Sequence, residues 1–99
     1  MRPFLHVARV EDWEASRAAG EYAVPAGPDP FTHACYPEQL AGVLERFYAG
    51  VPRAELVLLE IDPGGLPVTV EAAGDGAGDF PHVYGPIPVA SVTATRAVD

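Results

Sequence analysis

The segment from Phe4 to Val10 is mainly apolar and predicts a first strand, with Phe4, His6 and Ala8 on one face and Leu5, Val7 and Arg9 on the other. Glu11 and Asp12 follow, and acids in the first turn of a helix interact favourably with its dipole. The pattern therefore predicts a short helix through residues 13–19. Gly20 is expected directly after its last turn, because glycine readily adopts the left-handed backbone that ends many helices.

Short extended segments and a proline-rich stretch come next. Residues 21–24 are a candidate for a short strand. The segment 25–30 carries three prolines, which cannot continue a ladder of backbone hydrogen bonds, so it predicts a loop. Residues 31–33 predict a brief extended segment that leads into the next helix.

The clearest periodicity of the chain follows Pro37, a residue that the first turn of a helix tolerates well. Gly50 and Pro52 are expected to end this second helix. Its apolar residues recur at i, i+3, i+4 and i+7, so they form one stripe that we expect to be buried. The stripe consists of Leu40, Val43, Leu44 and Phe47.

The second half of the chain predicts strands separated by turns. Residues 56–61 form a short apolar run, which is typical of a central strand. Residues 62–65 predict a turn, and residues 68–72 alternate as a half-buried strand does. The glycine-rich segment 74–78 predicts a loop, and residues 89–97 predict a final strand.

These elements predict a single domain over residues 1–99, because a chain of this length suffices for one core and not for two. Their order, β-α-β-β-α-β-β-β, indicates an α+β fold. We expect a small mixed, mainly antiparallel β-sheet core with two helices packed beside it.

The charge of the chain limits its partners. Fourteen acidic residues outnumber six arginines, there is no lysine, and the net charge is −8. An acidic surface repels phosphate backbones and anionic lipids, so we expect neither broad nucleic-acid binding nor membrane binding. One small anion could still bind locally, beside an arginine or a helix N-terminus.

Cysteine use and hydropathy predict a cytoplasmic location. Cys35 is the single cysteine, so no internal disulfide can form, which suits a reducing compartment. The first residues lack the apolar run of a signal peptide, and no stretch reaches the ~20 apolar residues of a membrane span. The bias toward alanine, glycine, proline and arginine favours a bacterial source.

Three histidines are the first candidates for chemistry, because imidazole can transfer protons near neutral pH. His6 lies in the apolar first strand, His33 just before the second helix, and His82 between a proline and a turn. Each could instead be a structural core, capping or turn residue. His33 borders a helix N-terminus, whose free amides favour phosphate or carboxylate. The histidines lack the close spacing of zinc ligands, so we expect no metal.

Three further residues each have two interpretations. Cys35 is either a nucleophile activated near a helix start or a small buried hydrophobe. Glu71 points away from the valines of its strand, and is either a solvated residue or a carboxylate that lines a cleft. Tyr84 either donates a hydrogen bond to a ligand or packs against the neighbouring prolines.

Several ordered motifs resemble one known family. The segment Phe31-Thr32-His33, which leads into Pro37-Glu38-Gln39-Leu40, and the segment Phe80-Pro81-His82-Val83-Tyr84-Gly85-Pro86 resemble the domain-of-unknown-function 952 family. The resemblance spans nearly the whole chain in the right order. The chain departs from the family pattern at Ala34-Cys35-Tyr36, where a Cys-Ser-Thr-like run is usual, and in the proline-rich loop.

The resemblance implies a fold similar to that of the ADP-ribosyltransferase superfamily, and with it NAD as a possible cofactor. By that analogy His6 would hold a ribose hydroxyl, and His33 with the helix start would face phosphate. Glu71 or His82 would complete the catalytic group. Cys35, Tyr84 and Gln39 are the further candidates for contacts with the ligand.

The sequence leaves three functions open: an enzyme acting on an NAD-like or ribose-phosphate ligand, a binding module that senses such a ligand, and an accessory interaction domain. The first two need the candidate residues to converge. We therefore predict that His6, His33 and His82 face one shared cleft, which binds a small anionic ligand at the N-terminus of the second helix. In an accessory domain, all three histidines would be structural.

Overall fold

The computed structural model describes residues 2–22, 30–72 and 78–98. In these ranges it has two α-helices, eight strands and three single turns of 3₁₀ helix. The α-helices and strands, in chain order, are β1 (Phe4–Arg9), α1 (Val10–Ala19), β2 (Glu21–Tyr22), β3 (Thr32–His33), α2 (Leu40–Phe47), β4 (Leu56–Ile61), β5 (Val68–Ala72), β6 (Asp79–Val83), β7 (Ile87–Pro88) and β8 (Val92–Ala97).

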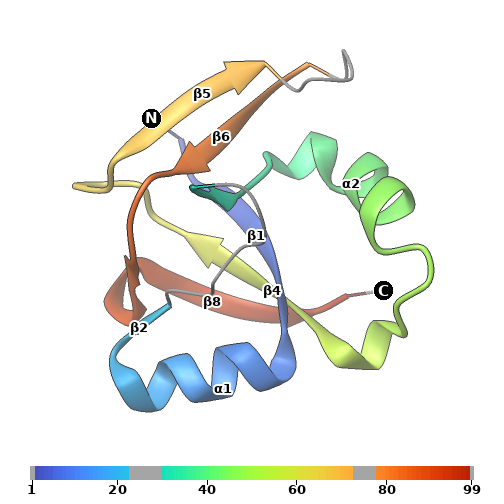
Figure 1. Ribbon diagram of the computed structural model, residues 1–99, viewed down its shortest axis with the longest axis horizontal. Helices are drawn as coiled ribbons and strands as arrows, with labels where there is room; N and C mark the ends of the chain where they lie inside the picture. The colour runs from blue at the N-terminus through green and yellow to red at the C-terminus, as the bar shows by residue number, and fades with distance from the viewer. Residues whose placement is uncertain (1, 23–29, 73–77, 99) are drawn as a thin grey trace.

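The strands form three small sheets whose pairings are all antiparallel in the described parts of the chain. We call β1-β4-β8 the core sheet and β3-β6-β5 the site sheet, while β2 and β7 form a separate pair. In Figure 1 the core sheet crosses the middle of the molecule and the pair β5–β6 lies above it. The α+β fold class with an antiparallel core and two helices is as predicted.

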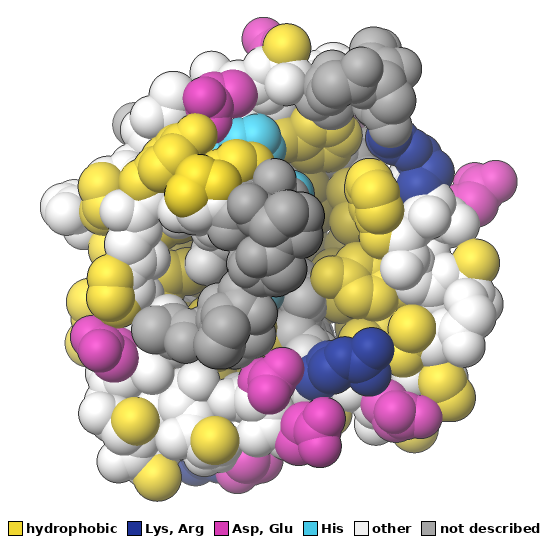
Figure 2. Space-filling model, viewed as in Figure 1, with side chains coloured by type: hydrophobic (Ala, Val, Ile, Leu, Met, Phe, Trp, Pro, Cys, Tyr) yellow, Lys and Arg dark blue, Asp and Glu magenta, His cyan; other side chains and the backbone are white. Residues whose placement is uncertain are grey.

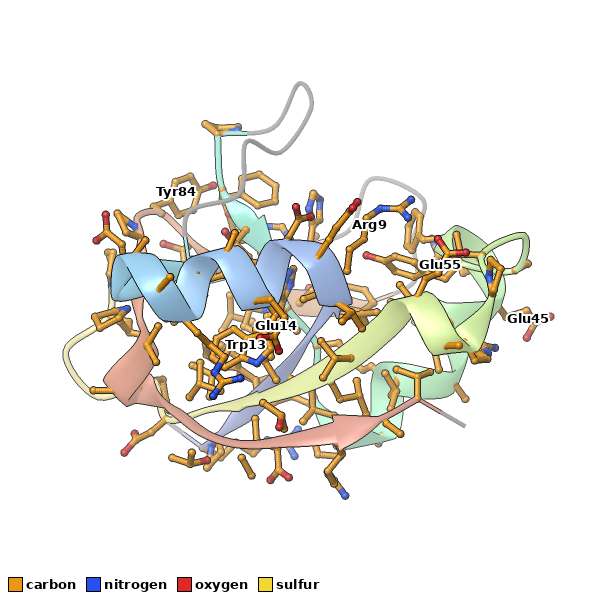
Figure 3. All side chains as sticks on the ribbon, turned by 90° about the horizontal axis from the view of Figure 1, so that it is seen from below. Arg9, Trp13, Glu14, Glu45, Glu55 and Tyr84 are labelled. Atoms are coloured by element: carbon orange, nitrogen blue, oxygen red, sulfur yellow. The ribbon has the colours of Figure 1, made fainter. Side chains whose placement is uncertain are left out.

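Strands β1 and β4 of the core sheet are buried on both faces because their side chains alternate between two apolar clusters, whereas the edge strand β8 is largely exposed. On one face Leu59 of β4 packs in a cluster with Trp13 of α1. On the other face Leu58 packs in a cluster with Leu44 of α2. Figure 3 shows Trp13 pointing from α1 toward the sheet. The apolar run at 56–61 is thus the central strand that its composition predicts.

Helix α1 ends where the sequence predicts. Gly20 has a left-handed backbone with φ of 89°, and its N–H donates to the carbonyl of Ser16. The Ser16 hydroxyl in turn donates to the carbonyl of Asp12, 2.7 Å away. The turn returns the chain directly into β2, which places Tyr22 in the core.

The predicted buried stripe of the second helix is only partly correct. A 3₁₀ turn precedes α2, Leu44 is buried, and Leu40 and Val43 are half-buried, but the Phe47 side chain is 63% exposed. The helix ends at Phe47, and the next residue, Tyr48, packs against the core cluster in its place. The apolar stripe is therefore buried only as far as Leu44, and its last residue faces solvent.

The strand β6 was missed because Pro81 lies in its middle. A proline has no N–H to donate, which normally confines it to sheet edges. Here the Pro81 carbonyl accepts from Ala34 on the β3 side, so its nitrogen faces that side too and no bond to β5 is lost. The two-residue strand β7 was also missed.

Two other expectations need adjustment. Val70, expected on the buried face of its strand, is 42% exposed, because β5 is an edge strand of the site sheet. The last strand starts at Val92, since Val89–Ser91 forms a 3₁₀ turn. The predicted loops at 25–30 and 74–78 fall largely outside the described residues. Neither helix in the described ranges has the length and apolar character needed to cross a bilayer.

Candidate functional site

Strand pairing brings two of the three histidines together. In the site sheet, His33 of β3 lies directly opposite His82 of β6. Side chains directly opposite in antiparallel strands share one face, and their ring centroids are 5.5 Å apart. Two residues far apart in the sequence therefore become neighbours, as the shared-cleft prediction requires of this pair.

An aromatic residue that the site prediction did not include completes this group. Phe31 stacks on the His82 ring at a centroid distance of 3.9 Å and lies 4.7 Å from the His33 ring. The Tyr84 ring lies 5.3 Å from the Phe31 ring. We call Phe31, His33, His82 and Tyr84 the ring cluster. The two-residue spacing of Phe31 and His33, which puts both on one face of an extended segment, was the signal available in the sequence.

Glu71 connects two members of the ring cluster. Its Oε1 atom lies 2.8 Å from Nδ1 of His82 and accepts a 2.5 Å hydrogen bond from the Tyr84 hydroxyl. The Tyr84 hydroxyl, and after it the His82 ring, hold the pKa of the Glu71 carboxyl below its ordinary value. The carboxylate is thus ionised at neutral pH and can only accept hydrogen bonds. Nδ1 of His82 therefore carries a proton, which leaves Nε2 for a ligand.

The ring cluster extends from the interior to the surface. His82 is 8% exposed, Tyr84 is 40% exposed, and His33 is exposed. Histidine side chains reach the surface among hydrophobic side chains on the face shown in Figure 2. A ligand that contacts the exposed rings would thus lie close to a histidine with a fixed proton position.

His6 lies against the main chain of His33. Its Nδ1 atom is 2.5 Å from the His33 carbonyl oxygen, and its Nε2 atom is 2.8 Å from the Tyr22 hydroxyl. Burial lowers the pKa of the His6 ring to about 4, so the ring is neutral at pH 7. Both of its nitrogens are used inside the protein, in contrast to those of His82.

The same chain can be compared with known families and structures. A family model described as "Protein of unknown function (DUF952)" matches residues 7–95. The chain belongs to the DUF952 family. The match includes the whole ring cluster and Glu71, and it begins one residue after His6. No curated protein matches the chain.

Solved structures of one bacterial protein have the same fold as this DUF952 domain. The crystal structure of protein CC0527 from Caulobacter crescentus aligns with a TM-score of 0.84 and 27% identity, covering 99% of this chain and 87% of that one. The solution NMR structure of CC0527 aligns with a TM-score of 0.78 and 28% identity, covering 100% and 86%.

Two other predicted ligand contacts of this DUF952 domain have partners within the chain. Cys35 is 2% exposed and exchanges backbone hydrogen bonds with Leu5 of β1. Burial, and after it the nearby Glu38 carboxylate, raises the pKa of the Cys35 thiol to about 11, so it stays protonated at neutral pH. Gln39 accepts from the N–H of Tyr36, 2.9 Å away, and donates to the carbonyl of Asp79, 2.7 Å away.

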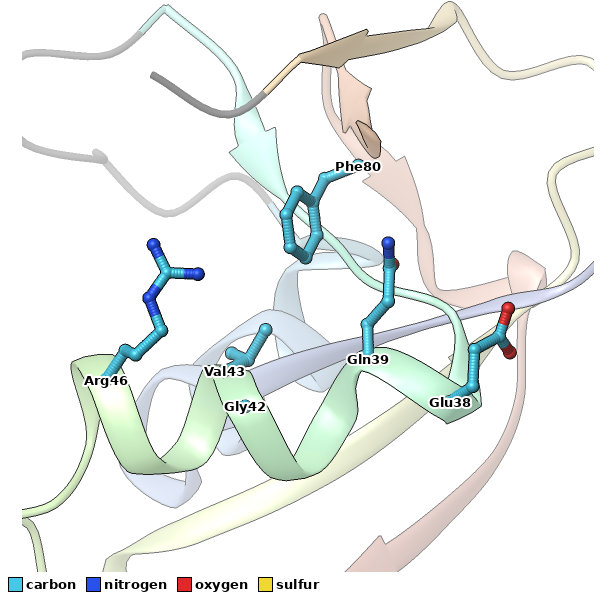
Figure 4. Close-up of a pocket in the computed structure, with 6 residues that line it drawn as sticks. All are labelled: Glu38, Gln39, Gly42, Val43, Arg46 and Phe80. Atoms are coloured by element: carbon cyan, nitrogen blue, oxygen red, sulfur yellow. The ribbon is translucent and has the colours of Figure 1, made fainter. Parts of the chain in front are cut away.

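A pocket of about 260 Å³ lies between α2 and β6, outside the ring cluster. In Figure 4 Phe80 projects from β6 over α2, and Arg46 lies at the far end of the row of lining residues from Glu38. The lining residues are Glu38, Gln39, Gly42, Val43, Arg46 and Phe80. Gln39 is the sole predicted site residue among them, so this pocket does not unite the three histidines.

The described residues contain no group of three or more His, Cys, Asp or Glu side chains placed to hold a metal ion. His82 and Glu71 alone would supply two ligands, whereas zinc sites in proteins use three or four. The expectation that the domain has no structural metal stays a prediction, which elemental analysis of the purified protein tests.

Proposed function

We propose that this domain binds a small anionic ligand of the ribose-phosphate or NAD-like class at the ring cluster, with His82 as a general base. The observation that carries the proposal is the 2.8 Å contact between Glu71 Oε1 and His82 Nδ1, next to the exposed His33 ring. A cytoplasmic location remains our expectation, in keeping with the single buried cysteine.

The pair of Glu71 and His82 supports proton transfer because a carboxylate on Nδ1 fixes the tautomer of an imidazole. The fixed ring presents the lone pair of Nε2, and the carboxylate stabilises the imidazolium that forms when a proton is taken up. The stacking of Phe31 on His82 restrains the ring further. A hydroxyl or a phosphate oxygen of a bound ligand is the group that such a nitrogen would contact.

The proposed ligand class follows from two features. The family resemblance implies a fold similar to that of ADP-ribosyltransferases, whose ligand is NAD. The ring cluster offers aromatic faces beside imidazole groups, which suits a ligand with a planar base and a phosphate. His33, at the exposed edge of the ring cluster, is the residue proposed to meet the phosphate.

An NMR titration tests this proposal. We would add NAD, and separately inorganic phosphate, while following the ring signals of His33 and His82. We expect the two sets of signals to shift together and to give one dissociation constant. Glu71→Gln should weaken binding about tenfold or more, because a hydrogen bond to a charged group is lost. Ring signals that move with different dissociation constants, or do not move, would refute the shared site.

Glu60→Gln is the matched control for Glu71→Gln. Glu60 lies on β4 of the core sheet, its side chain is 34% exposed against 38% for Glu71, and it binds Arg96 at 2.8 Å. The same chemical change is thus made in a carboxylate with a similar exposure and an ionic partner. Binding by the control variant should match that of the unmodified protein.

The alternative function is a non-enzymatic accessory or protein-interaction domain whose histidines are structural. The observation that favours it is His6, whose ring nitrogens both bond within the protein. Under this alternative, replacing His82 should lower the free energy of unfolding, and neither NAD nor phosphate should move its ring signals. Under the proposal, His82→Gln should abolish the response of His33 to the ligand while the fold persists.

A further inference from the structure

One imidazole joins strands of all three sheets at the edge of the ring cluster. His6 belongs to β1 of the core sheet, Tyr22 to β2 of the small pair, and His33 to β3 of the site sheet. The His6 ring contacts the other two through its two nitrogens, at 2.8 Å to the Tyr22 hydroxyl and 2.5 Å to the His33 carbonyl oxygen.

The direction of each hydrogen bond follows from what its partner can do. A carbonyl oxygen only accepts, so Nδ1 of His6 carries the proton and donates to His33. In the neutral ring Nε2 then holds a lone pair, and the Tyr22 hydroxyl donates to it. Tyr22 is 2% exposed, and burial raises the pKa of its hydroxyl, which therefore remains a donor at neutral pH.

The strand that this chain of hydrogen bonds holds is short. β3 has two residues, and its pairs with β6 are Thr32 with Val83 and His33 with His82. These two pairs, together with the hydrogen bond from the Ala34 N–H to the Pro81 carbonyl, set the distance between the His33 and His82 rings on that side. On the other side of β3, the His6 ring donates a hydrogen bond to the His33 carbonyl. Two residues later, Cys35 exchanges backbone hydrogen bonds with Leu5 of β1.

We infer that Tyr22 and His6 are positioning residues of the proposed site: the hydrogen bonds from the Tyr22 hydroxyl through the His6 ring to the His33 carbonyl hold β3 where the His33 ring meets that of His82. The inference rests on the proposed function. It gives His6 a role other than contact with a ribose hydroxyl, because both of its nitrogens are already bonded. It also adds Tyr22, which the motifs of the sequence did not single out as a site residue.

Tyr22→Phe tests the inference, because it removes the hydroxyl and keeps the ring. Tyr48→Phe is the matched control, since the Tyr48 hydroxyl also bonds β1, at the Val7 carbonyl 3.4 Å away, on the sheet face opposite to that of His6. The first readout is the set of ring signals of His33 and His82 without ligand. We expect Tyr22→Phe to shift them and Tyr48→Phe to leave them in place.

The second readout is affinity for NAD, measured by the same NMR titration. We expect up to about a tenfold weakening in Tyr22→Phe, because one hydrogen bond between neutral groups is lost. Unchanged ring signals together with unchanged affinity would overturn the positioning role while leaving the proposed function in place. If the unmodified protein binds no NAD, the proposed function fails, and the ligand-free ring signals still decide the positioning role.

A second pair of variants covers the case in which Tyr22→Phe does not fold. The side-chain N–H of asparagine can replace Nδ1–H of His6 as donor to the His33 carbonyl, whereas leucine cannot. His6→Asn should therefore keep the ring signals of His33 and His82 closer to those of the unmodified protein than His6→Leu does. Equal displacement in both variants would show that the hydrogen bond to His33 does not position the site.

Discussion

The core sheet and the site sheet are both antiparallel, but they differ in the burial of their strands and in the polar contacts they carry. Every strand position of β4 is buried or half-buried, and Leu59 and Ile61 have no exposed surface. In the site sheet, β5 is exposed or half-buried at each residue, and the ring cluster with Glu71 bonds and stacks across the strands. The core sheet thus supplies the most buried strand, β4, whereas the site sheet joins a buried strand, β6, to the exposed edge strand β5 and carries the ring cluster.

His6 and His82 differ in the same way, in the kind of group that each ring contacts. His6, on the core sheet, has a carbonyl and a hydroxyl as hydrogen-bond partners, and burial lowers its pKa although the His33 carbonyl and the charge of Asp12 act to raise it. His82, on the site sheet, has the Glu71 carboxylate as a partner. An imidazole that is to gain a proton needs such a counter-charge, which is why we assign the base to His82.

The largest expected effect lies in the core sheet. Leu59→Ala should lower the free energy of unfolding by about 2–5 kcal/mol, because it opens a cavity at a fully buried position. Val70→Ala on β5 is the control, and it should stay within about 0.5 kcal/mol, as ordinary surface positions do. Chemical denaturation measures both. Similar losses in the two variants would mean that the site sheet contributes as much to stability as the core sheet.

His6 is responsible for the next largest expected effect, a dependence of the free energy of unfolding on pH. Because the pKa of His6 is near 4 when folded and about 6.5 when unfolded, the unfolded state binds more protons between these values. The contribution of the neutral His6 ring to the free energy of unfolding is therefore complete above pH 6.5, and it is lost as the pH falls toward 4. This difference between the folded and unfolded pKa values of His6 corresponds to about 3 kcal/mol of the free energy of unfolding.

Denaturation curves of the unmodified protein and His6→Asn, recorded across this pH range, isolate that effect. All other titrating groups are common to both proteins, so their contributions largely cancel in the difference. We expect the unmodified protein to lose more stability than the variant as the pH falls from 6.5 to 4. Parallel losses would show that His6 is not buried as a neutral ring.

A smaller contrast separates two residues of α2. Leu44→Ala should cost about 2 kcal/mol, at the low end for a buried leucine, since the Leu44 side chain is 8% exposed and the site can partly close. Phe47→Ala should stay within about 0.5 kcal/mol, because the Phe47 side chain is 63% exposed. Equal losses of stability in the two variants would show that Phe47 is buried with Leu44, as the periodicity predicts.

The core sheet and α1 could be predicted from the sequence because local patterns determine them. The apolar run of β4, the mainly apolar segment of β1 and the glycine that ends α1 each depend on neighbours in the chain. The place of Phe47 could not be predicted, since periodicity describes a helix and does not say at which residue it ends. Pro81 concealed β6 for a related reason: its tolerance depends on which side of the strand its nitrogen faces.

Most residues of the candidate site could be predicted from the sequence, but the contacts between them could not. Histidine chemistry and the family motifs pointed to His33, His82 and Glu71, but their contacts depend on the register of β3, β6 and β5. That register pairs residues far apart in the chain. Phe31 and Tyr22 were missed because aromatic residues beside strands are usually core, and nothing local distinguishes a residue that stacks on or bonds to a histidine.

The smallest effect concerns the carboxylate of the site sheet. The Tyr84 hydroxyl is the largest of the causes that lower the pKa of Glu71, ahead of the His82 ring. Tyr84→Phe should therefore raise this pKa toward its ordinary value. A carboxyl with a lowered pKa stabilises the fold above its unfolded pKa, and this contribution is lost as the pH falls through the folded value. The variant should thus be slightly less stable than the unmodified protein at pH 7, where this contribution is present, and the difference should disappear in acid, where the contribution is lost in both proteins.

Carboxyl carbon NMR titrations of Tyr84→Phe and of the control Tyr48→Phe measure this shift directly. Tyr48 is a half-buried tyrosine whose hydroxyl bonds the Val7 carbonyl instead of Glu71. We expect the Glu71 pKa to rise in the first variant alone. If it is the same in both, the His82 ring by itself sets the charge of the carboxylate, and Tyr84 contributes a surface contact. If it rises in Tyr84→Phe while the His82 ring signals stay in place, the two donors act on Glu71 independently.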